Sequence, residues 1–536
     1  MRSECLPFTQ IPHATPLFTD FLSYQPKVHP FYPRSAFLAE WLKSEAAAVH
    51  YDVQRQARVA TILARQNHGW GNSAAVTKNI ERLRAGALAV VTGQQVGLFG
   101  GPLFAVYKAL TAVKLAEVAT HNGIDCVPVF WLATEDHDLA EVNHISLPSG
   151  EGLHTLRVST AGEANAPVGT VRFGDEVLQA VDQTAGLLGD TPVVAALRES
   201  YRPGETFGSA FARLFAHLFG DWGVILLDAS DPDLHRIAEP IYRAAIERAA
   251  ELDDALLARG KDLESAGYHQ QVKVTPSSTL LFTRLDGARV PVHRRSNSAE
   301  HFVFEKEDIP IQEMLPGIAS SPQDFSPNVL LRPVVQDYLL PTLAYTGGSA
   351  EVAYFAQAAV VYERLLGRVT PIVPRFSATI VDSKAHTLLD RYHLNLSDLF
   401  HGPEQLRERL AEHALPGELQ ASFDQAKASL QSSIAAIRDS LSRLDKTLVD
   451  AATNAESKMQ HQLESLRARA ARAELRQSEI LGRHADLLSN SLYPNKVLQE
   501  REIAGVYFLA RHGTELLRQL YDSIHTDCLD HQVISL

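Results

Sequence analysis

Cysteine and long apolar runs are both scarce in this sequence. Its three cysteines, Cys5, Cys126 and Cys528, are too few and too widely spaced for a disulfide framework or a zinc knuckle. The N-terminus lacks the basic region and apolar core of a signal peptide. No window approaches the roughly 20 apolar residues of a membrane-spanning helix. These absences predict a cytoplasmic protein with no membrane partner.

Positive charge is also scarce, and common cofactor motifs are missing. Lysine and arginine total 50 against 63 acidic residues, a net charge of −13, which disfavours a dedicated nucleic-acid surface. The chain has neither G-x-x-x-x-G-K-S/T nor G-x-G-x-x-G at its glycine-rich turn, which argues against a P-loop NTPase or an ordinary NAD enzyme. It also has no H-E-x-x-H, so no protein-bound metal is predicted. Small molecules are the expected ligands.

The length indicates several structural units. A chain of 536 residues exceeds the roughly 100–200 residues of one domain, and its 45% hydrophobic content can fill a large core. We predict an N-terminal helical region that packs on the core, an α/β body with an inserted lobe, a coiled-coil arm and a C-terminal segment that returns to the body. Short alternating runs favour β-structure in the lobe. The predicted boundaries are 1–86, 87–400 with the lobe at about 148–219, 404–480, and 481–536.

A strand, turn, helix and second strand follow one another from Ala87. The first strand is predicted at 87–92, Pro102 is expected to open the helix after the turn, and the strand at 126–133 is apolar on both faces, as in a central parallel strand. Further buried strands are predicted at 223–228 and 369–373. In open α/β sheets ligands bind beyond the carboxyl ends of the strands. The turn and the polar residues after the second strand should therefore meet at one crevice.

The glycine-rich turn is a candidate anion site. Its glycines would let backbone N–H groups approach a ligand, and the following helix N-terminus would favour negative charge, although a tight connection without a ligand remains the alternative. Lys108 could bind phosphate, but it shares a polar stripe with Lys114, for which a solvated helix face is the simpler interpretation. The candidate binding residues here are Thr92, Gly93, Gln94, Gln95, Gly97, Gly100 and Gly101.

The acidic stretch after the second strand holds the candidate catalytic residues. His137 could act as a general base, and Glu135 or Asp136 could orient it or hold a divalent ion, more readily Mg²⁺ arriving with a nucleotide than a protein-bound metal. Asp138 is either a ligand-binding residue or the N-cap of a helix that begins at Leu139. Asn143 is a further binding candidate.

A second group of candidates lies downstream. Arg332 interrupts an apolar run, where a guanidinium needs an anionic partner that is either an internal carboxylate or a bound one. The same argument applies to Arg375. Ser349 and Glu351 also suit the N-cap and first turn of a helix. The binding candidates of this group are Asn328, Arg332, Gly347, Gly348, Glu351 and Arg375.

The segment from Glu418 to Glu479 contains neither glycine nor proline. Its apolar residues recur at three- and four-residue intervals, the heptad spacing of a coiled coil. A hairpin that folds near Ala452 to Asn454 would give almost the same pattern. The pattern therefore fits both dimerisation with a second chain and packing of the segment on itself.

The motifs resemble, in order, those of the BshC family of bacillithiol biosynthesis. The resemblance rests on two strings, TGQQVGLFGGPL at 92–103 and WLATEDHD at 131–138. It continues downstream in FSPN, LRP, GG with Glu351, PR, LYP and QER. The resemblance implies an α/β protein with a Rossmann-like parallel-sheet core, inserted lobes and a long α-helical coiled-coil arm used in homodimerisation. It also implies a cytoplasmic ligase that adds L-cysteine to the amine of glucosaminyl-malate.

That reaction would require activation, because a free carboxylate does not condense with an amine in water. ATP or another nucleotide with Mg²⁺ is therefore expected. Our hypothesis is that the glycine-rich turn binds phosphate or carboxylate, that His137 or a neighbouring carboxylate deprotonates the amine, and that Arg332 with the Gly347–Gly348 turn holds the malate. A nucleotidyltransferase-like enzyme acting on a sugar or amino acid is one alternative. A non-catalytic dimeric scaffold is another, although the intact cluster at 135–138 argues against it.

Overall fold

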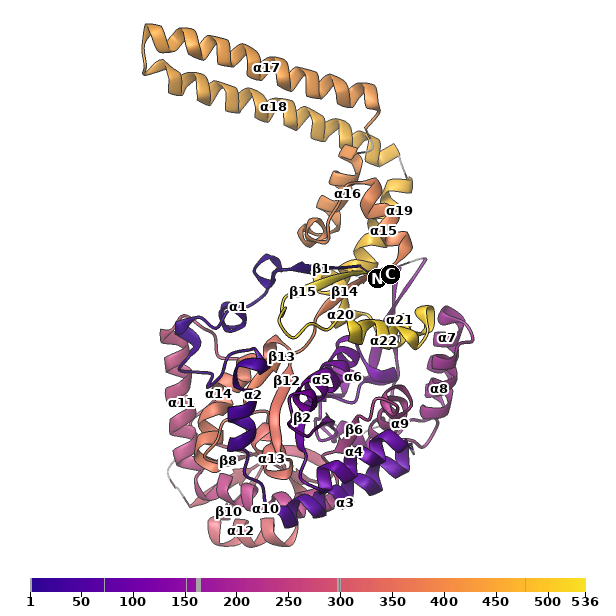
Figure 1. The fold of residues 1–536 in the computed structure, drawn as a ribbon, viewed down its shortest axis with the longest axis vertical. Coiled ribbons are helices and arrows are strands. Elements are labelled where there is room, and N and C mark those ends of the chain that lie inside the picture. The colour runs from indigo at the N-terminus through magenta and orange to yellow at the C-terminus, as the bar shows by residue number, and fades with distance from the viewer. Residues whose placement is uncertain are drawn as a thin grey trace.

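The computed structural model describes residues 2–71, 73–150, 152–160, 165–295, 298, 300–413, 415–477 and 479–536. A helical arm projects from one end of a larger α/β body, and the two chain ends lie side by side at their junction (Figure 1). Within the described ranges, no helix is long and apolar enough to cross a membrane.

The body is built around a five-stranded sheet whose strands are all parallel, in the order β13-β12-β2-β3-β6. This arrangement confirms the predicted α/β class, and buried strands are present at both further positions expected from the sequence. Strands β3 and β6 extend the sheet to one side of β2, and β12 and β13 extend it to the other. The topological switch therefore lies between β2 and β12, where open parallel sheets bind ligands. The strands are β2 (Leu88–Gln94), β3 (Cys126–Leu132), β6 (Ile225–Asp228), β12 (Thr342–Gly347) and β13 (Ile372–Pro374).

Helix α5 (Phe104–His121), which joins β2 to β3, differs from expectation in two ways. It begins at Phe104, because Pro102 instead forms a β-bridge with Ala504. Its polar stripe is not a solvated face, since Lys108 is only 4% exposed. The ammonium group of Lys108 contacts Gly93, Gln94 and Glu351, and α21 (Gly505–His512) and α22 (Glu515–Asp522) contact α5 elsewhere. A contact so remote in sequence leaves no mark on the local pattern.

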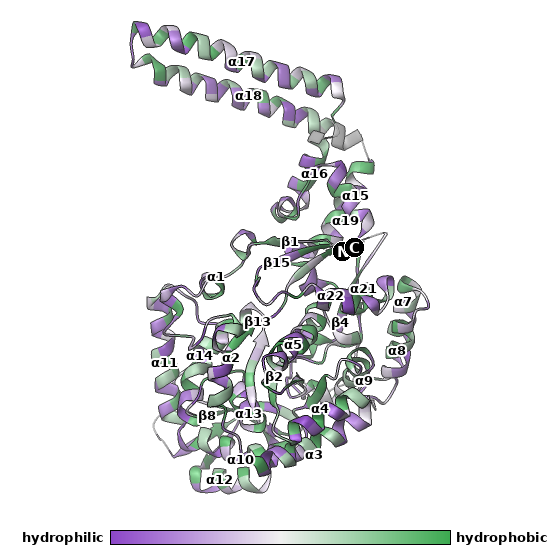
Figure 2. Cartoon of the chain, in the orientation of Figure 1, coloured by the Kyte–Doolittle hydropathy of each residue, from purple (hydrophilic) through white to green (hydrophobic). Residues whose placement is uncertain are grey.

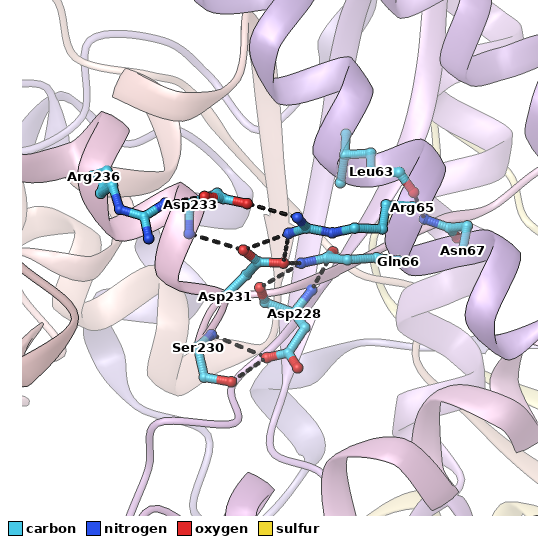
Figure 3. Close-up of polar contacts among 9 residues, drawn as sticks. All are labelled: Leu63, Arg65, Gln66, Asn67, Asp228, Ser230, Asp231, Asp233 and Arg236. Carbon is cyan, nitrogen blue, oxygen red and sulfur yellow. Dashed lines mark hydrogen bonds and ion pairs between the residues drawn. The ribbon is translucent and has the colours of Figure 1, made fainter.

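The N-terminal region is mainly helical and protects one edge of the sheet. Its helices are α1 (Pro16–Leu22), α2 (Leu38–Ala48), α3 (Val53–Trp70) and α4 (Ala74–Arg84). The side-chain amide of Asn67 on α3 donates to Leu226 O (2.8 Å) and accepts from its N–H (3.0 Å). Gln66 bonds the backbone of Asp228 in the same way, as Figure 3 shows. Two side chains thus take the place of a further strand beside β6.

The predicted lobe is more helical than the sequence indicated. Among the described residues of the lobe, the β-structure is the hairpin of β4 (His144–Ser149) and β5 (Gly152–Arg157) and an isolated bridge between Arg172 and Thr206. The expected β-structure is therefore present, but the three helices α7 (Glu176–Leu188), α8 (Pro192–Ser200) and α9 (Phe207–Phe219) were not predicted.

A second insertion was not predicted. It is an antiparallel sheet in the order β10-β9-β8-β7-β11. Its strands are β7 (Ser278–Leu285), β8 (Ala288–Arg294), β9 (His301–Phe304), β10 (Glu307–Pro310) and β11 (Phe325–Pro327). The helices around it are α10 (Pro232–Glu247), α11 (Ala249–Ser265), α12 (Ile311–Ser320) and α13 (Arg332–Leu339).

The arm is a helical hairpin in which α17 (Gly417–Leu444) and α18 (Leu448–Gln477) lie side by side (Figure 1). The turn is at 445–447, not near Ala452 to Asn454, because Asp445 Oδ1 accepts hydrogen bonds from the backbone and hydroxyl of Thr447 (both 2.8 Å). Self-packing is therefore present, and dimerisation stays a prediction. The arm is connected to the body through α15 (Ser383–Arg391), α16 (Pro403–His413) and α19 (Glu479–Leu492).

The C-terminal segment returns to the body and completes a small mixed sheet. Strand β15 (His531–Ser535) pairs with β1 (Arg2–Leu6) on one side and β14 (Ala378–Val381) on the other. The short helix α20 (Gln499–Glu502) joins the same edge, since the Gln499 amide bonds both backbone groups of Ile380 (2.7 and 2.8 Å).

A buried ion pair fixes this segment to the end of β13. Arg375 donates to Glu500 Oε1 (2.7 Å), which also accepts from the Ser377 hydroxyl (3.0 Å). Glu500 Oε2 accepts from Ala378 N (3.0 Å). Burial alone would raise the pKa of Glu500, but the charge and hydrogen bond of Arg375 outweigh it and hold the pKa below its usual value. The pair therefore stabilises the fold while Glu500 is ionised.

Replacing Glu500→Gln should destabilise the whole chain by about 3–5 kcal/mol, because Arg375 would remain buried without its counter-charge. Denaturant unfolding of the full chain at pH 7 measures the loss. The effect should be complete above the unfolded glutamate pKa of about 4.3 and should shrink as the pH falls through the lower folded value.

The matched control is Asp439→Asn, which breaks an exposed pair with Arg443 on the arm. That variant should lose less than about 1 kcal/mol. Equal, small losses in both variants would contradict a structural role for the buried pair.

Candidate active site

A cavity of about 610 Å³ opens beyond the carboxyl ends of β2, β3 and β12. It lies at the topological switch, and residues from both predicted groups line it. Those residues are Gly93, Gln94, Gln95, Glu135, Asp136, His137, Asn328, Arg332, Gly348, Glu351 and Arg375. The expected convergence of the two polar groups is therefore present in the fold.

One end of the cavity is cationic. It is lined by the cations Lys108, Arg332, Arg375 and Arg501. Two carboxylates lie near them, Glu351 in the lining and Glu500 behind Arg375. Four cations against two carboxylates leave an excess of two positive charges. Helix α14 (Ser349–Leu365) also begins here, with Gly348 rather than Ser349 as its N-cap, so its positive dipole end adds to the field.

Lys108 crosses the switch point from α5 to α14. Its Nζ lies 2.7 Å from Glu351 Oε2 and donates to Gly93 O (2.8 Å) and Gln94 Oε1 (2.9 Å). Burial lowers the pKa of Lys108 to about 8, although Glu351 opposes the shift. Burial alone would raise the pKa of Glu351, but Lys108 outweighs it and lowers that pKa. Lys108 therefore begins to lose its charge just above neutral pH.

The two arginines predicted to need anionic partners differ. Arg375 has an internal partner in Glu500. Arg332 instead donates to the Tyr354 hydroxyl (2.9 Å) and Gln336 Oε1 (3.1 Å), and its guanidinium lies over the rings of Trp131 and Tyr345. Within the described ranges it forms no ion pair with a carboxylate. Arg332 is therefore the cation best suited to a bound anion.

The other end of the cavity is acidic. The Gln95 amide donates to Asp136 Oδ2 (2.7 Å) and Glu141 Oε2 (2.8 Å), while Asp136 Oδ1 accepts from His137 N (2.7 Å). The segment is anchored from β6, because the Thr134 hydroxyl donates to Asp228 Oδ1 (2.5 Å). Asp228 is itself held by Gln66, as Figure 3 shows.

The ring of His137 is held by Arg289 rather than by Asp136. Nη1 of Arg289 lies 3.2 Å from Nδ1 of His137, whereas the nearest Asp136 oxygen is 3.7 Å away. Because a guanidinium can only donate, Nδ1 accepts and the proton of the neutral ring lies on Nε2. In this arrangement His137 has no free acceptor nitrogen, so a carboxylate is the better candidate for the base.

Glu135 has a partner that the sequence analysis missed. His235 on α10 is buried, with Nε2 3.2 Å from Glu135 Oε1 and Nδ1 3.1 Å from the Tyr242 hydroxyl. Burial alone would lower the pKa of His235, but Glu135 outweighs it and raises that pKa. His235 shares a helix face with Ala238 and Tyr242, a placement that periodicity could have shown. Periodicity gave no such indication for Arg289 or Glu500.

Seven predicted residues lie outside the cavity lining. Gly100 (φ +85°) and Gly101 (φ +71°) adopt backbone conformations that favour glycine, and Gly100 packs on Leu214 of α9. Asp138 caps α6 (Leu139–Val142) by accepting from Glu141 N (3.1 Å), as the capping alternative predicted. Asn143 accepts from Arg157 (2.6 Å). The full set is Thr92, Gly97, Gly100, Gly101, Asp138, Asn143 and Gly347.

Within the described ranges, no group of three or more histidine, cysteine, aspartate or glutamate side chains is arranged to hold a metal ion. At the acidic end, the carboxylates of Asp136 and Glu141 accept hydrogen bonds from the Gln95 amide.

The fold and cavity define a Rossmann-like domain joined to a coiled-coil domain. Residues 1–376 match the model "Bacillithiol biosynthesis BshC, N-terminal Rossmann-like domain", and residues 378–536 match "Bacillithiol biosynthesis BshC, C-terminal coiled-coil domain". The chain belongs to the BshC family of bacillithiol biosynthesis, which confirms the resemblance seen in its motifs.

Three full-length relatives share the printed name "Putative cysteine ligase BshC". The protein from Koribacter versatilis is 50% identical over 535 residues, with 100% of both chains covered. That from Solibacter usitatus is 37% identical, again with 100% of both covered. The Salinibacter ruber protein is 32% identical and covers 97% of this chain and 96% of its own.

Anion binding in the cavity should weaken as the pH rises from 7 to 9. Lys108, with a pKa of about 8, is mostly charged at the lower pH and mostly neutral at the higher. If only the charged form binds, Kd for L-malate should increase by about tenfold at pH 9. Isothermal titration calorimetry at both pH values measures the change.

Lys108→Arg serves as the control, because a guanidinium keeps its positive charge at both pH values. Its Kd should change far less between the two pH values. An unchanged Kd in the wild-type protein would show that Lys108 does not contribute to the anion site.

Proposed function

We propose that this protein joins the carboxyl group of L-cysteine to the amine of glucosaminyl-malate, the last step of bacillithiol biosynthesis. The full-length relatives named as cysteine ligases support this role. The observation that carries it is a single cavity with a cationic end and an acidic end. A substrate that bears both carboxylates and an amine matches this polarity.

The malate carboxylates would occupy the cationic end. Two carboxylates would balance its excess of two positive charges, and Arg332 offers a guanidinium that has no ion pair among the described residues. A bidentate contact between a guanidinium and a carboxylate is stronger than a hydrogen bond from a neutral donor to a carboxylate. Binding of malate at the cationic end would then fix which part of the sugar conjugate faces the carboxylates of the acidic end.

The amine would meet the acidic end, where Glu135 is our candidate general base. One of its oxygens faces His235. Within the described ranges the other oxygen makes no hydrogen bond, whereas both oxygens of Asp136 accept one. A carboxylate so placed can attract the ammonium form of the substrate and take its proton. His235 would act as a positioning residue, through Glu135.

ATP or another nucleotide, with Mg²⁺, would be the co-substrate that activates the carboxyl group of cysteine as an adenylate or acyl phosphate. Because the malate carboxylates would already balance the excess charge of the cationic end, Mg²⁺ would supply most of the positive charge for the phosphates of the nucleotide. Lys108, beside Gly93 at the end of β2, would be a cation of the chain close to them. The protein's own part is to hold the anions, position the amine and accept its proton.

Mass spectrometry tests this reaction directly. Purified protein is incubated with ATP, Mg²⁺, cysteine and glucosaminyl-malate, and bacillithiol, AMP and ADP are monitored together. Product with AMP would indicate adenylation, and product with ADP would indicate phosphorylation. Pyrophosphate–ATP exchange without amide product would favour the nucleotidyltransferase-like alternative, and no product with any nucleotide would contradict the proposal.

Glu135→Gln should lower kcat by about 10²–10⁴-fold, because the amide cannot accept the proton of the amine. The circular dichroism spectrum and unfolding midpoint should stay close to those of the wild type. The control is Asp138→Asn, which keeps an N-cap outside the cavity and should retain activity within about threefold. Full activity in Glu135→Gln would remove Glu135 from the mechanism.

We also propose that the arm forms a homodimer with a second copy of the chain. After the hairpin has packed on itself, apolar residues remain exposed on both helices, and Leu444 is 79% exposed. Ile437, Leu441 and Leu444 line a groove of about 380 Å³ on α17. Figure 2 shows apolar and polar residues alternating along both helices. An apolar heptad stripe that the hairpin leaves uncovered suits an identical stripe from a partner.

Introducing charge into this stripe should separate the copies. Size-exclusion chromatography with light scattering should give a dimer mass for the wild type and a monomer mass for Ile437→Glu with Leu444→Glu. Arg443→Glu, next to Leu444 but outside the stripe, is the control and should remain dimeric. A monomeric wild-type protein would contradict the proposal.

A further inference from the structure

Two cysteines that are 523 positions apart in the sequence lie together at the junction of the chain ends. Cys5 is on β1, where it pairs in register with Gln532 of β15, and Cys528 lies in the segment that leads into β15. Their Sγ atoms are 2.7 Å apart. A disulfide needs about 2.05 Å, so a shift of less than an ångström would join them.

The surroundings hold this pair in place and leave it accessible. Phe8 N donates to Asp530 Oδ1 (3.2 Å), which fixes the segment after Cys528 against the N-terminal chain. Cys5 is exposed and Cys528 is partly exposed, whereas the third cysteine, Cys126, is buried in β3. The chain thus has two thiols that a small reagent can reach and one that it cannot.

A hydrogen bond links the two thiols. The hydrogen bond with Cys528 is the main cause that raises the pKa of Cys5 to about 11, and burial and the nearby Asp530 and Asp527 add to it. Either sulfur can be the donor of this hydrogen bond, and the thiol that loses its proton is the nucleophile.

We propose that Cys5 and Cys528 form a thiol–disulfide exchange site for low-molecular-weight disulfides. One of the two, as its thiolate, attacks a disulfide RSSR, forming a mixed disulfide and releasing RS⁻. The other thiol then passes its proton to the released thiolate and attacks the protein sulfur of the mixed disulfide, which forms the Cys5–Cys528 bond and releases a second RS⁻. The two protein thiols are oxidised and RSSR is reduced to two thiols. In reducing compartments such bonds are typically transient and redox-responsive.

The bond would lock a strand that contacts the wall of the cavity. His531 of β15 bonds the hydroxyls of Ser377 (2.7 Å) and Thr379 (2.8 Å), and Ser377 also donates to Glu500, the partner of Arg375. His531, three residues after Cys528, is therefore two hydrogen bonds away from the Arg375–Glu500 pair. This site stands independently of the proposed ligase reaction.

Oxidised glutathione is a suitable probe for the full-length reduced protein, with intact-mass spectrometry as the readout. The wild type should lose two hydrogens and retain no glutathione, and peptide mapping should join the peptides of Cys5 and Cys528. Cys126→Ser, the matched control, should behave identically. Cys5→Ser should retain one glutathione on Cys528, because the resolving thiol is missing, and dithiothreitol should reverse both products.

Two results would overturn the proposal. One is a wild-type protein that retains glutathione on either cysteine in place of the internal bond. The other is a wild-type protein that stays fully reduced under conditions where Cys5→Ser takes up glutathione. Unfolding midpoints for each variant verify that the substitutions leave the fold intact, so neither result would arise from misfolding.

Discussion

Glu351, a carboxylate in the first turn of α14 whose side chain is only 15% exposed, links the elements around the cavity. Glu351 accepts hydrogen bonds from Lys108 (2.7 Å to Nζ), the Tyr345 hydroxyl (2.6 Å) and Gly348 N (2.7 Å). It thereby connects the helix after β2 with the strand and helix on the other side of the switch point. A buried charge is tolerated only with such compensation, and removing one partner leaves the other uncompensated. The position of α5 relative to α14, and hence the shape of the cavity wall between them, depends on this group.

The cavity also shows how far local charge can differ from the charge of the chain. The protein carries a net charge of −13, yet one end of its cavity has more cations than carboxylates. A small anion that approached the cavity would meet an unfavourable overall field and a favourable local one. Low-dielectric walls of aromatic residues, among them Trp131 and Tyr345, strengthen the local contribution.

Sequence patterns were sufficient for the features that depend on neighbouring residues. Continuous apolar runs identified β2 and β3, and the polar residues that follow them were correctly placed at one edge. Lys108 was misjudged because its ion-pair partner Glu351 lies far away in the sequence, where the local pattern of the helix does not show it. Arg289 was missed because it comes from an antiparallel insertion whose position over the sheet edge is not encoded locally. The heptad pattern of the arm could not locate its turn, since one long helix and a hairpin share the same spacing.

The connectivity has a consequence for the order of folding. The arm's contacts join helices separated by a three-residue turn, so it is local in sequence and should form quickly. By contrast, β2 must wait for β12, as Ala89 pairs with Thr342, and the wall around Arg375 must wait for Glu500. During synthesis all five strands of the central sheet emerge before the arm, but the wall around Arg375 stays incomplete until Glu500, beyond the arm, has emerged. The candidate active site is among the last parts of the protein to be assembled.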